Sequence, residues 1–135
     1  MFIYERTIRV QDTDATGAIY FANQLQIALE AFEEFLLHQG FSVGDMISKN
    51  QFLLPIVHTE GDFFAPLAAG DRVEVTLSFS RVGTTSFTHT SDLLKKNEKV
   101  GTVSIVHVVY CPEKKQSIPI PEEIKKIISP LSGEL

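Results

Sequence analysis

The chain has 135 residues, 44% of them hydrophobic and 21% charged, and a net charge of −5 with a pI near 5.3. That composition is typical of a globular chain long enough to bury a core, and it argues against a disordered one. The acidic balance, with no basic run longer than two lysines, argues against nucleic acid as a partner. Because Cys111 is the only cysteine, the chain cannot form an internal disulfide or a cysteine-based metal cluster.

The N-terminal residues alternate in polarity and carry charges, and no apolar run approaches the ~18 residues of a membrane span. We therefore expect no signal peptide, no membrane-spanning segment and a cytoplasmic location. The sequence shows no internal repeat, low-complexity tract or linker, so residues 1–135 are expected to form a single domain.

Residues 3–10 alternate in polarity, which predicts a strand, and residues 11–17 are rich in turn formers, which predicts a loop. From Ala18 onward, apolar residues recur at helical spacing until Gly40 supplies a stop signal. This pattern predicts a helix of roughly 20 residues with a broad apolar stripe. Its polar residues, among them Gln24 and Glu30, are expected on the opposite face. The stripe requires a sheet to pack against.

After a predicted loop at residues 44–50, four strand candidates follow without another long helix. They lie at residues 53–64, 72–81, 86–95 and 100–111. Residues 96–98 predict a hairpin turn, and Pro121 opens a short helix that extends to about residue 128. The final strand candidate is apolar on both faces, so we expect its outer face to meet another subunit. The order of elements predicts an α+β fold, with an antiparallel sheet covered on one face by the long helix.

The segment from Asp12 to Asn23 is the most informative one for chemistry. Asp14 precedes Gly17, where the backbone can approach a ligand closely, and the predicted helix follows directly. The first N–H groups of a helix have no internal acceptor and lie at the positive end of its dipole, so they can stabilise an oxyanion. Asp14 could therefore serve catalysis, but it could equally cap the helix, since aspartate is a favoured N-cap residue. The residues alone leave both interpretations open.

The same segment resembles the active-site signature of the 4-hydroxybenzoyl-CoA thioesterase family, which reads D-x-D-x-x-G-x-x-x-x-x-N. Four positions match it: Asp12, Asp14, Gly17 and Asn23. Residues 63–66 and 70–73 resemble later segments of that family, in the right order. The resemblance implies a hot-dog fold, in which an antiparallel five-stranded sheet wraps around one long helix. It also implies an acyl-CoA thioesterase with Asp14 as the catalytic carboxylate and the backbone N–H of Phe21 polarising the thioester carbonyl.

Within the family, the chain is most similar to the 1,4-dihydroxy-2-naphthoyl-CoA thioesterases of phylloquinone biosynthesis. The similarity rests on residues 19–21, 23–24, 54–58 and 62–66. It implies hydrolysis of that ester to the free acid and CoA, in phylloquinone or menaquinone biosynthesis. Coenzyme A is then part of the substrate, and no cofactor is expected. The alternative is a broad or short-chain hydrolase of the Tol-Pal-associated type, but those proteins usually carry histidine where this chain has Phe21.

A lone carboxylate suits the cleavage of a thioester. An aspartate is ionised at neutral pH, and a CoA thiol has roughly the acidity of cysteine, so it can leave as thiolate without strong protonation. The reaction therefore needs a nucleophile or a base together with an oxyanion site, and it does not require a histidine-based triad. Asp14 could attack the carbonyl carbon or activate a water molecule, and the sequence does not separate these two roles.

Two sets of residues are predicted to contact the substrate. The acyl group is expected to lie against Gly17, Tyr20 and His58. The CoA phosphates are expected to be held by cations that cluster at strand ends, namely Arg81, Lys95 and Lys96. For each cation, a solvated surface charge is the alternative.

The remaining histidines give weaker signals. His58, Glu60 and Asp62 share one strand face, which suggests a metal site. Residues two apart lie ~6.5–7 Å apart along a strand, however, and no second cluster of ligands accompanies them, so we expect no metal. His89 and His107 lie inside predicted strands and are expected to be hydrogen-bonded structural residues.

Two further functions stay open. A hot-dog dehydratase would resemble families with a histidine and an acidic residue on the long helix, but residues 24–35 contain no histidine. A non-catalytic acyl-CoA-binding module would not need Asp14. Related proteins form dimers with the active site between subunits, often paired into tetramers, so the resemblance implies a homodimer and a homotetramer built from it.

Overall fold

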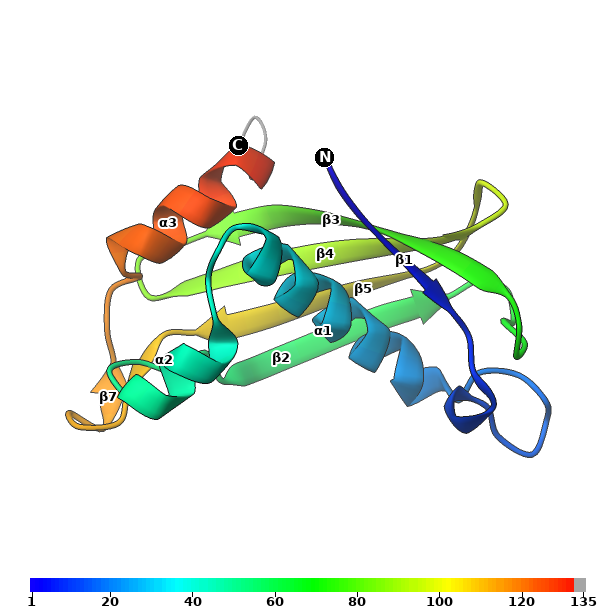
Figure 1. Cartoon of the computed structure of the whole chain (residues 1–135), viewed down its shortest axis with the longest axis horizontal. Coiled ribbons are helices and arrows are strands. Elements are labelled where there is room, and N and C mark those ends of the chain that lie inside the picture. The colour runs from blue at the N-terminus through cyan, green and yellow to red at the C-terminus, as the bar shows by residue number, and fades with distance from the viewer. Residues whose placement is uncertain (133–135) are drawn as a thin grey trace.

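The protein is described by a computed structural model that covers residues 1–132. Five strands form one antiparallel sheet in the order β1-β3-β4-β5-β2, and helix α1 lies across one face of it (Figure 1). The bounds of these elements are β1 (Phe2–Thr7), α1 (Phe21–His38), β2 (Ile56–Phe63), β3 (Arg72–Val82), β4 (Ser86–Lys95) and β5 (Glu98–Val108). The smaller elements are η1 (Val10–Asp12), α2 (Val43–Lys49), β6 (Tyr110–Cys111), β7 (Gln116–Ser117), α3 (Glu122–Ile128) and η2 (Ser129–Leu131). The predicted α+β architecture is confirmed.

The hairpin between β4 and β5 shows how local sequence sets the strand register. Lys96 and Asn97 both have left-handed backbone conformations, with φ of 50° and 67°, between the paired residues Lys95 and Glu98. A two-residue turn of this handedness matches the twist of the flanking strands. The predicted strand at 86–95 has the bounds of β4, whereas the one at 100–111 is interrupted after Val108 and resumes as β6.

Helix α1 begins at Phe21, later than the predicted start at Ala18. Before Phe21 the chain makes two isolated β-bridges, from Thr13 to Ile19 and from Ala18 to Ala68, and these keep the backbone extended. The N–H of Tyr20, the N-cap residue, also donates to the carbonyl of Asp12 at 2.8 Å. Tertiary pairing therefore overrides the helical periodicity of residues 18–20.

Helix α2 replaces the loop that we predicted at residues 44–50. The Ser42 hydroxyl accepts a hydrogen bond from the Asp45 N–H at 3.0 Å, and the helix ends at Asn50, whose φ of 55° is left-handed. Ser42 followed three residues later by an acidic residue is a helix-start signal that the sequence contained. Gly44 and the shortness of the helix concealed it, because a helix of seven residues, about two turns, carries little periodicity.

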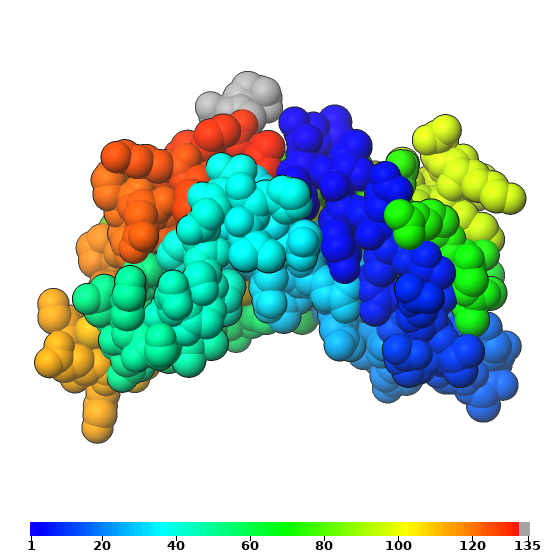
Figure 2. All heavy atoms as spheres, viewed as in Figure 1, coloured from blue at the N-terminus to red at the C-terminus, as the bar shows by residue number. Residues whose placement is uncertain are grey.

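The core lies between α1 and the sheet. The helix buries Ile27, Ala31 and Phe35 on its inner face, while α2, α3 and the N-terminal segment cover the same side of the molecule (Figures 1 and 2). One polar residue departs from the prediction. Gln24 was expected on the outer face, but it is only 2% exposed and belongs to the buried side of α1. Among residues 1–132, no helix is long and apolar enough to cross a membrane.

Strand β2 is an edge of the sheet. It pairs with β5 on one side only, and most of its residues are exposed. Several large apolar side chains on or beside it are open to solvent, including Ile56, Val57, Phe63 and Phe64. An exposed edge strand offers unpaired backbone groups to another chain.

Candidate active site

Asp14 lies at the surface in a tight turn that its own carboxylate stabilises. Oδ1 accepts hydrogen bonds from the Thr16 N–H at 2.8 Å and from the Thr16 hydroxyl at 2.6 Å. The Gly17 N–H donates to the Asp14 carbonyl at 3.0 Å, and Gly17 has a φ of 85°, which a side chain would disfavour. Within residues 1–132 we find no donor to the second oxygen, Oδ2, so this oxygen is free to meet a substrate or a water molecule.

The hydrogen bonds from Thr16 have an electrostatic consequence. The hydroxyl and then the N–H of Thr16 lower the pKa of Asp14, because both stabilise the ionised carboxylate. Asp14 does not cap α1, since the N-cap residue is Tyr20. The capping alternative is therefore wrong, and so is the expectation that α1 starts directly after Gly17. The Asp14 N–H instead donates to the Ala18 carbonyl at 3.0 Å, which folds the loop back towards the helix start.

Asp12 has the opposite environment. It is 3% exposed, and both of its carboxylate oxygens bind the Arg6 guanidinium, at 2.7 Å and 3.2 Å. It also accepts from the Arg9 N–H at 2.8 Å and from the Asn23 side-chain amide at 3.3 Å. The hydrogen bond from Arg6, followed by those from Arg9 and Asn23, lowers the pKa of Asp12. Asp12 therefore ties β1, the loop and the first turn of α1 together.

Arg6 extends this network to the middle of α1. Its Nε donates to Glu30 at 2.7 Å, and the Tyr4 hydroxyl donates to the same carboxylate at 3.0 Å. Neither partner was predicted from the sequence. Arg6 was not identified, and Glu30 was expected on the outer face of the helix. The signal for this network was weak, because its partners are separated by 24 residues along the chain. We name Arg6, Asp12, Asn23 and Glu30 the anchor network.

A shallow groove of about 290 Å³ adjoins the Asp14 turn. It is lined by Ala18, Ile19, Phe21, Gln24, Phe63, Phe64, Ala65 and Pro66. The rings of Phe21 and Phe63 meet edge to face with centroids 6.2 Å apart, and both side chains are largely exposed. Phe21 is also the first residue of α1, so its N–H is one of those that a helix leaves without an internal acceptor. We name this cavity the aromatic groove.

Of the three residues predicted to contact the acyl group, two lie near the Asp14 turn and one does not. Gly17 belongs to the Asp14 turn, and Tyr20 is an exposed neighbour of Phe21, with ring centroids 4.9 Å apart. His58 lies on the exposed edge strand, where its Nε2 is 2.9 Å from a Glu60 oxygen, and it does not line the aromatic groove of its own chain. Within the described part of the chain, no three His, Cys, Asp or Glu side chains are grouped closely enough to hold a metal ion.

His89 and His107 form a buried pair in the core. Their Nε2 atoms are 3.0 Å apart, Phe32 stacks on the His89 ring, and His107 Nδ1 is 2.9 Å from the Leu54 carbonyl oxygen. Burial lowers the pKa of both rings, that of His89 well below its ordinary value, so both are neutral at pH 7. Their position in the core agrees with the structural role that the sequence predicted. The predicted hydrogen bonding is incomplete, because His89 Nδ1 has no partner among residues 1–132.

The three predicted phosphate-binding cations do not cluster within one chain. Arg81 pairs with Thr88 at the start of β4, whereas Lys95 lies at its end, about 24 Å away along an extended strand. Lys95 donates to Asp71 at 3.0 Å. Together with Lys96 it lines a cavity of about 320 Å³ that shares Ala65 and Pro66 with the aromatic groove. The two lysines are therefore next to the groove, and Arg81 is not.

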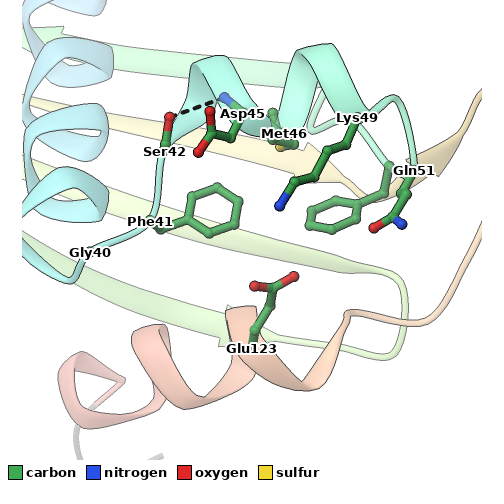
Figure 3. Close-up of a pocket in the computed structure, with 9 residues that line it drawn as sticks. Gly40, Phe41, Ser42, Asp45, Met46, Lys49, Gln51 and Glu123 are labelled. Atoms are coloured by element: carbon green, nitrogen blue, oxygen red, sulfur yellow. Dashed lines mark hydrogen bonds between the residues drawn. The ribbon is translucent and has the colours of Figure 1, made fainter.

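Another cavity, of about 150 Å³, lies beyond the C-terminal end of α1. It is bounded by α2, the start of α3 and the segment after Gly40, and Lys49 and Glu123 face it from opposite sides (Figure 3). The Asp14 turn lies before the other end of the same helix. This cavity contains none of the residues of the family signature.

Comparisons with known proteins agree with the site. The family description that matches residues 8–128 is the thioesterase-like superfamily. The 1,4-dihydroxy-2-naphthoyl-CoA hydrolase of Rippkaea orientalis is 36% identical over 124 residues, which cover 90% of each chain. The crystal structure of Slr0204, a 1,4-dihydroxy-2-naphthoyl-CoA thioesterase from Synechocystis, has a TM-score of 0.91 and 31% identity over 96% of both chains. The BH1999 gentisyl-coenzyme A thioesterase has a TM-score of 0.83 and 26% identity, over 94% of this chain and 98% of its own. The hot-dog prediction is thereby confirmed, and the chain belongs to the thioesterase-like superfamily.

Proposed function

We propose that this chain hydrolyses the thioester of an aromatic acyl-CoA, 1,4-dihydroxy-2-naphthoyl-CoA, to the free acid and CoA. The observation that carries the proposal is the position of Asp14, which is exposed and ionised beside a groove lined by aromatic side chains. The names of the relatives supply the acyl group. Membership of phylloquinone or menaquinone biosynthesis follows from that substrate, and a cytoplasmic location stays a prediction.

In this mechanism the carbonyl oxygen of the thioester accepts a hydrogen bond from the Phe21 N–H at the positive end of α1. Oδ2 of Asp14 then adds to the carbonyl carbon, the C–S bond breaks and CoA leaves as thiolate. Water hydrolyses the resulting anhydride and regenerates the carboxylate. Alternatively, Asp14 takes a proton from a water molecule that attacks the same carbon. Both routes use Oδ2, which the turn leaves unbonded while Thr16 fixes Oδ1.

The rest of the substrate fits the neighbouring cavities. An aromatic acyl group would pack against Phe21 and Phe63, which gain contact area where they are now exposed. The CoA phosphates would lie near Lys95 and Lys96, one cavity away from the groove. Arg81 could contribute to the same phosphates only from another chain, because it lies on β3 opposite Thr88, at the other end of β4 from Lys95. No cofactor takes part in either route.

The test is the release of free CoA by wild type and by Asp14→Asn. We expect turnover of 1,4-dihydroxy-2-naphthoyl-CoA to fall by at least about 100-fold, because the amide is neither a nucleophile nor a base. The thermal midpoint should stay unchanged, since the asparagine side-chain oxygen can still accept from Thr16. Equal rates of CoA release in the two proteins would contradict the mechanism. Faster hydrolysis of short aliphatic esters than of the naphthoyl ester would instead favour the Tol-Pal-associated alternative.

We also propose that the working form is a homodimer joined along β2. A second copy would pair with the unpaired side of this strand and cover the exposed Ile56, Val57 and Phe63. Phe63 also lines the aromatic groove, so the partner would help to enclose the substrate. Sedimentation equilibrium measures the mass directly. A dimer or a tetramer built from dimers is expected, and a monomer at micromolar concentration would overturn the proposal.

A further inference from the structure

Gln24 is a polar side chain buried at the wall of the aromatic groove. It follows Phe21 by one helical turn, and both side chains line the groove. The residue is 2% exposed, and its Oε1 has no hydrogen-bond partner among residues 1–132. An unpaired buried oxygen of this kind destabilises a protein, which is why most buried polar atoms are paired. Because the Gln24 side chain also lines the aromatic groove, a ligand that packs against it there could supply the missing donor.

Gly101 on β5 provides the space that Oε1 occupies. A Cβ atom at this position would lie 2.4 Å from Oε1, which is closer than side-chain atoms approach. In the sheet, Gly101 pairs with Phe63, another residue that lines the groove. The glycine therefore allows the Gln24 amide to sit beside the place where an aromatic ring would bind. A larger residue at position 101 would displace it.

Gln24 lies three residues after Phe21 on α1, close to the N–H that would bind the thioester carbonyl. The backbone of Gln24 lies about 4.5 Å of helix rise beyond the Phe21 N–H, which would hold the carbonyl oxygen, so the two residues belong to one turn of α1. An aromatic ring attached to that carbonyl would therefore lie beside the turn that carries Gln24. In 1,4-dihydroxy-2-naphthoyl-CoA, the 1-hydroxyl is adjacent to the thioester carbon and can donate to the thioester carbonyl within the same molecule. The 4-hydroxyl lies across the ring and has no such internal acceptor.

We infer that Gln24 accepts a hydrogen bond from the ring hydroxyl remote from the thioester, and so selects acyl groups that carry one. This inference rests on the proposed function, and it makes Gln24 a specificity-determining residue and not part of the bond-breaking machinery. A hydroxyl in this position satisfies Oε1, whereas an acyl group without it leaves the oxygen buried and unpaired. Sites built in this way discriminate strongly against the analogue that lacks the hydroxyl.

The experiment compares 1,4-dihydroxy-2-naphthoyl-CoA with 1-hydroxy-2-naphthoyl-CoA, which lacks the remote hydroxyl. We expect wild type to prefer the dihydroxy ester by about 10–100-fold in kcat/KM, the range of one buried hydrogen bond. In Gln24→Met, an apolar side chain of similar length, the preference should fall to about twofold or less while the monohydroxy ester is still hydrolysed. Gln26→Met, an exposed position on the same helix, is the matched control and should keep the wild-type ratio.

Two more measurements separate this role from a structural one. Thermal unfolding should show Gln24→Met to be at least as stable as wild type, because an unpaired buried oxygen is removed. Gly101→Ala keeps Gln24 but displaces its oxygen, and it should also lose the preference. If Gln24→Met retains the wild-type ratio, or if wild type hydrolyses both esters equally, the inference is wrong while the proposed function stands. If wild type hydrolyses neither ester, the proposed function fails and the inference with it.

Discussion

The two aspartates of the signature differ more than their closeness in sequence suggests. Asp12 is buried, and its oxygens are occupied by Arg6, Arg9 and Asn23. Asp14 is exposed. Among residues 1–132, only Thr16 of the same turn donates to its carboxylate, and both hydrogen bonds go to Oδ1. Both pKa values are lowered, but for different reasons, a guanidinium in one case and a local hydroxyl in the other.

The two aspartates therefore differ in what they can do: Asp12 fixes the loop, and Asp14 has an oxygen left for chemistry. The anchor network fixes the loop to β1 and α1. The carboxylates of Asp12 and Glu30 are both paired with the Arg6 guanidinium. Asp14 is held just firmly enough by Thr16 and Gly17 to point one free oxygen outwards. A carboxylate that binds an arginine on both oxygens is a poor nucleophile, and a carboxylate without a rigid support is poorly positioned.

The largest expected contrast is between Asp14→Asn and Asp12→Ala. The first should remove turnover and leave stability unchanged, as proposed above. The second should destabilise the fold by about 2–3 kcal/mol, because Arg6 loses a buried partner while Glu30 remains to bind it. Chemical denaturation measures this free energy. Turnover should fall as well, because the loop loses its attachment to α1.

Two controls sharpen that prediction. Glu30→Gln removes a partly exposed carboxylate from the same arginine, so its effect on stability should be below about 1 kcal/mol. The loss in Asp12→Ala should also depend on pH. Since the folded-state pKa of Asp12 is lowered, its contribution is present above about pH 4 and is lost as the pH falls through the folded pKa. A pH-independent difference, or a larger loss in Glu30→Gln, would show that Asp12 is not the centre of the anchor network.

The smallest expected effect belongs to Thr16→Val, which removes the hydroxyl donor to Asp14. Because that hydrogen bond stabilises the carboxylate, its loss raises the pKa of Asp14 towards the ordinary value. The ionised form is the active one, so the acidic limb of kcat/KM should move to higher pH. At pH 7 the rate should change by less than about threefold, since the carboxylate stays ionised. An unmoved limb would indicate that a group other than Asp14 controls it.

Much of the fold was predictable because it rests on local patterns. The alternation of residues 72–81 and 86–95, together with the turn formers between 96 and 98, placed β3, β4 and the hairpin correctly, whereas β5 both begins and ends earlier than predicted. The start of α1 was not predictable, because the bridge between Ala18 and Ala68 and the hydrogen bond from the Ile19 N–H to the Leu67 carbonyl are tertiary contacts. Helix α2 was missed for a different reason, since a short helix with a glycine near its start carries a cap signal but no periodicity.

The candidate site divides in the same way. The signature residues Asp12, Asp14, Gly17 and Asn23 are close in sequence, and their resemblance to a known family signature indicated a thioesterase loop before the comparisons established the family. The roles within it depended on contacts that the pattern does not show: Arg6 binds both oxygens of Asp12 and is itself held by Glu30 on α1, whereas Asp14 has no such partner among residues 1–132. Gln24 follows the same rule, because helical periodicity assigns it to solvent, whereas Gly101 on β5 opens a place for it in the groove wall.

The sequence by itself indicated the family, through its resemblance to a known signature, and the α+β order of elements, because both are carried by residues near one another in the chain. Only the tertiary structure decided which aspartate is buried, where α1 begins and which polar side chain reaches the groove. It also separated Arg81 from Lys95 and Lys96, which the sequence had grouped. The reason is physical: burial, pairing and charge at a residue are set by what packs against it, and those neighbours come from other strands and helices.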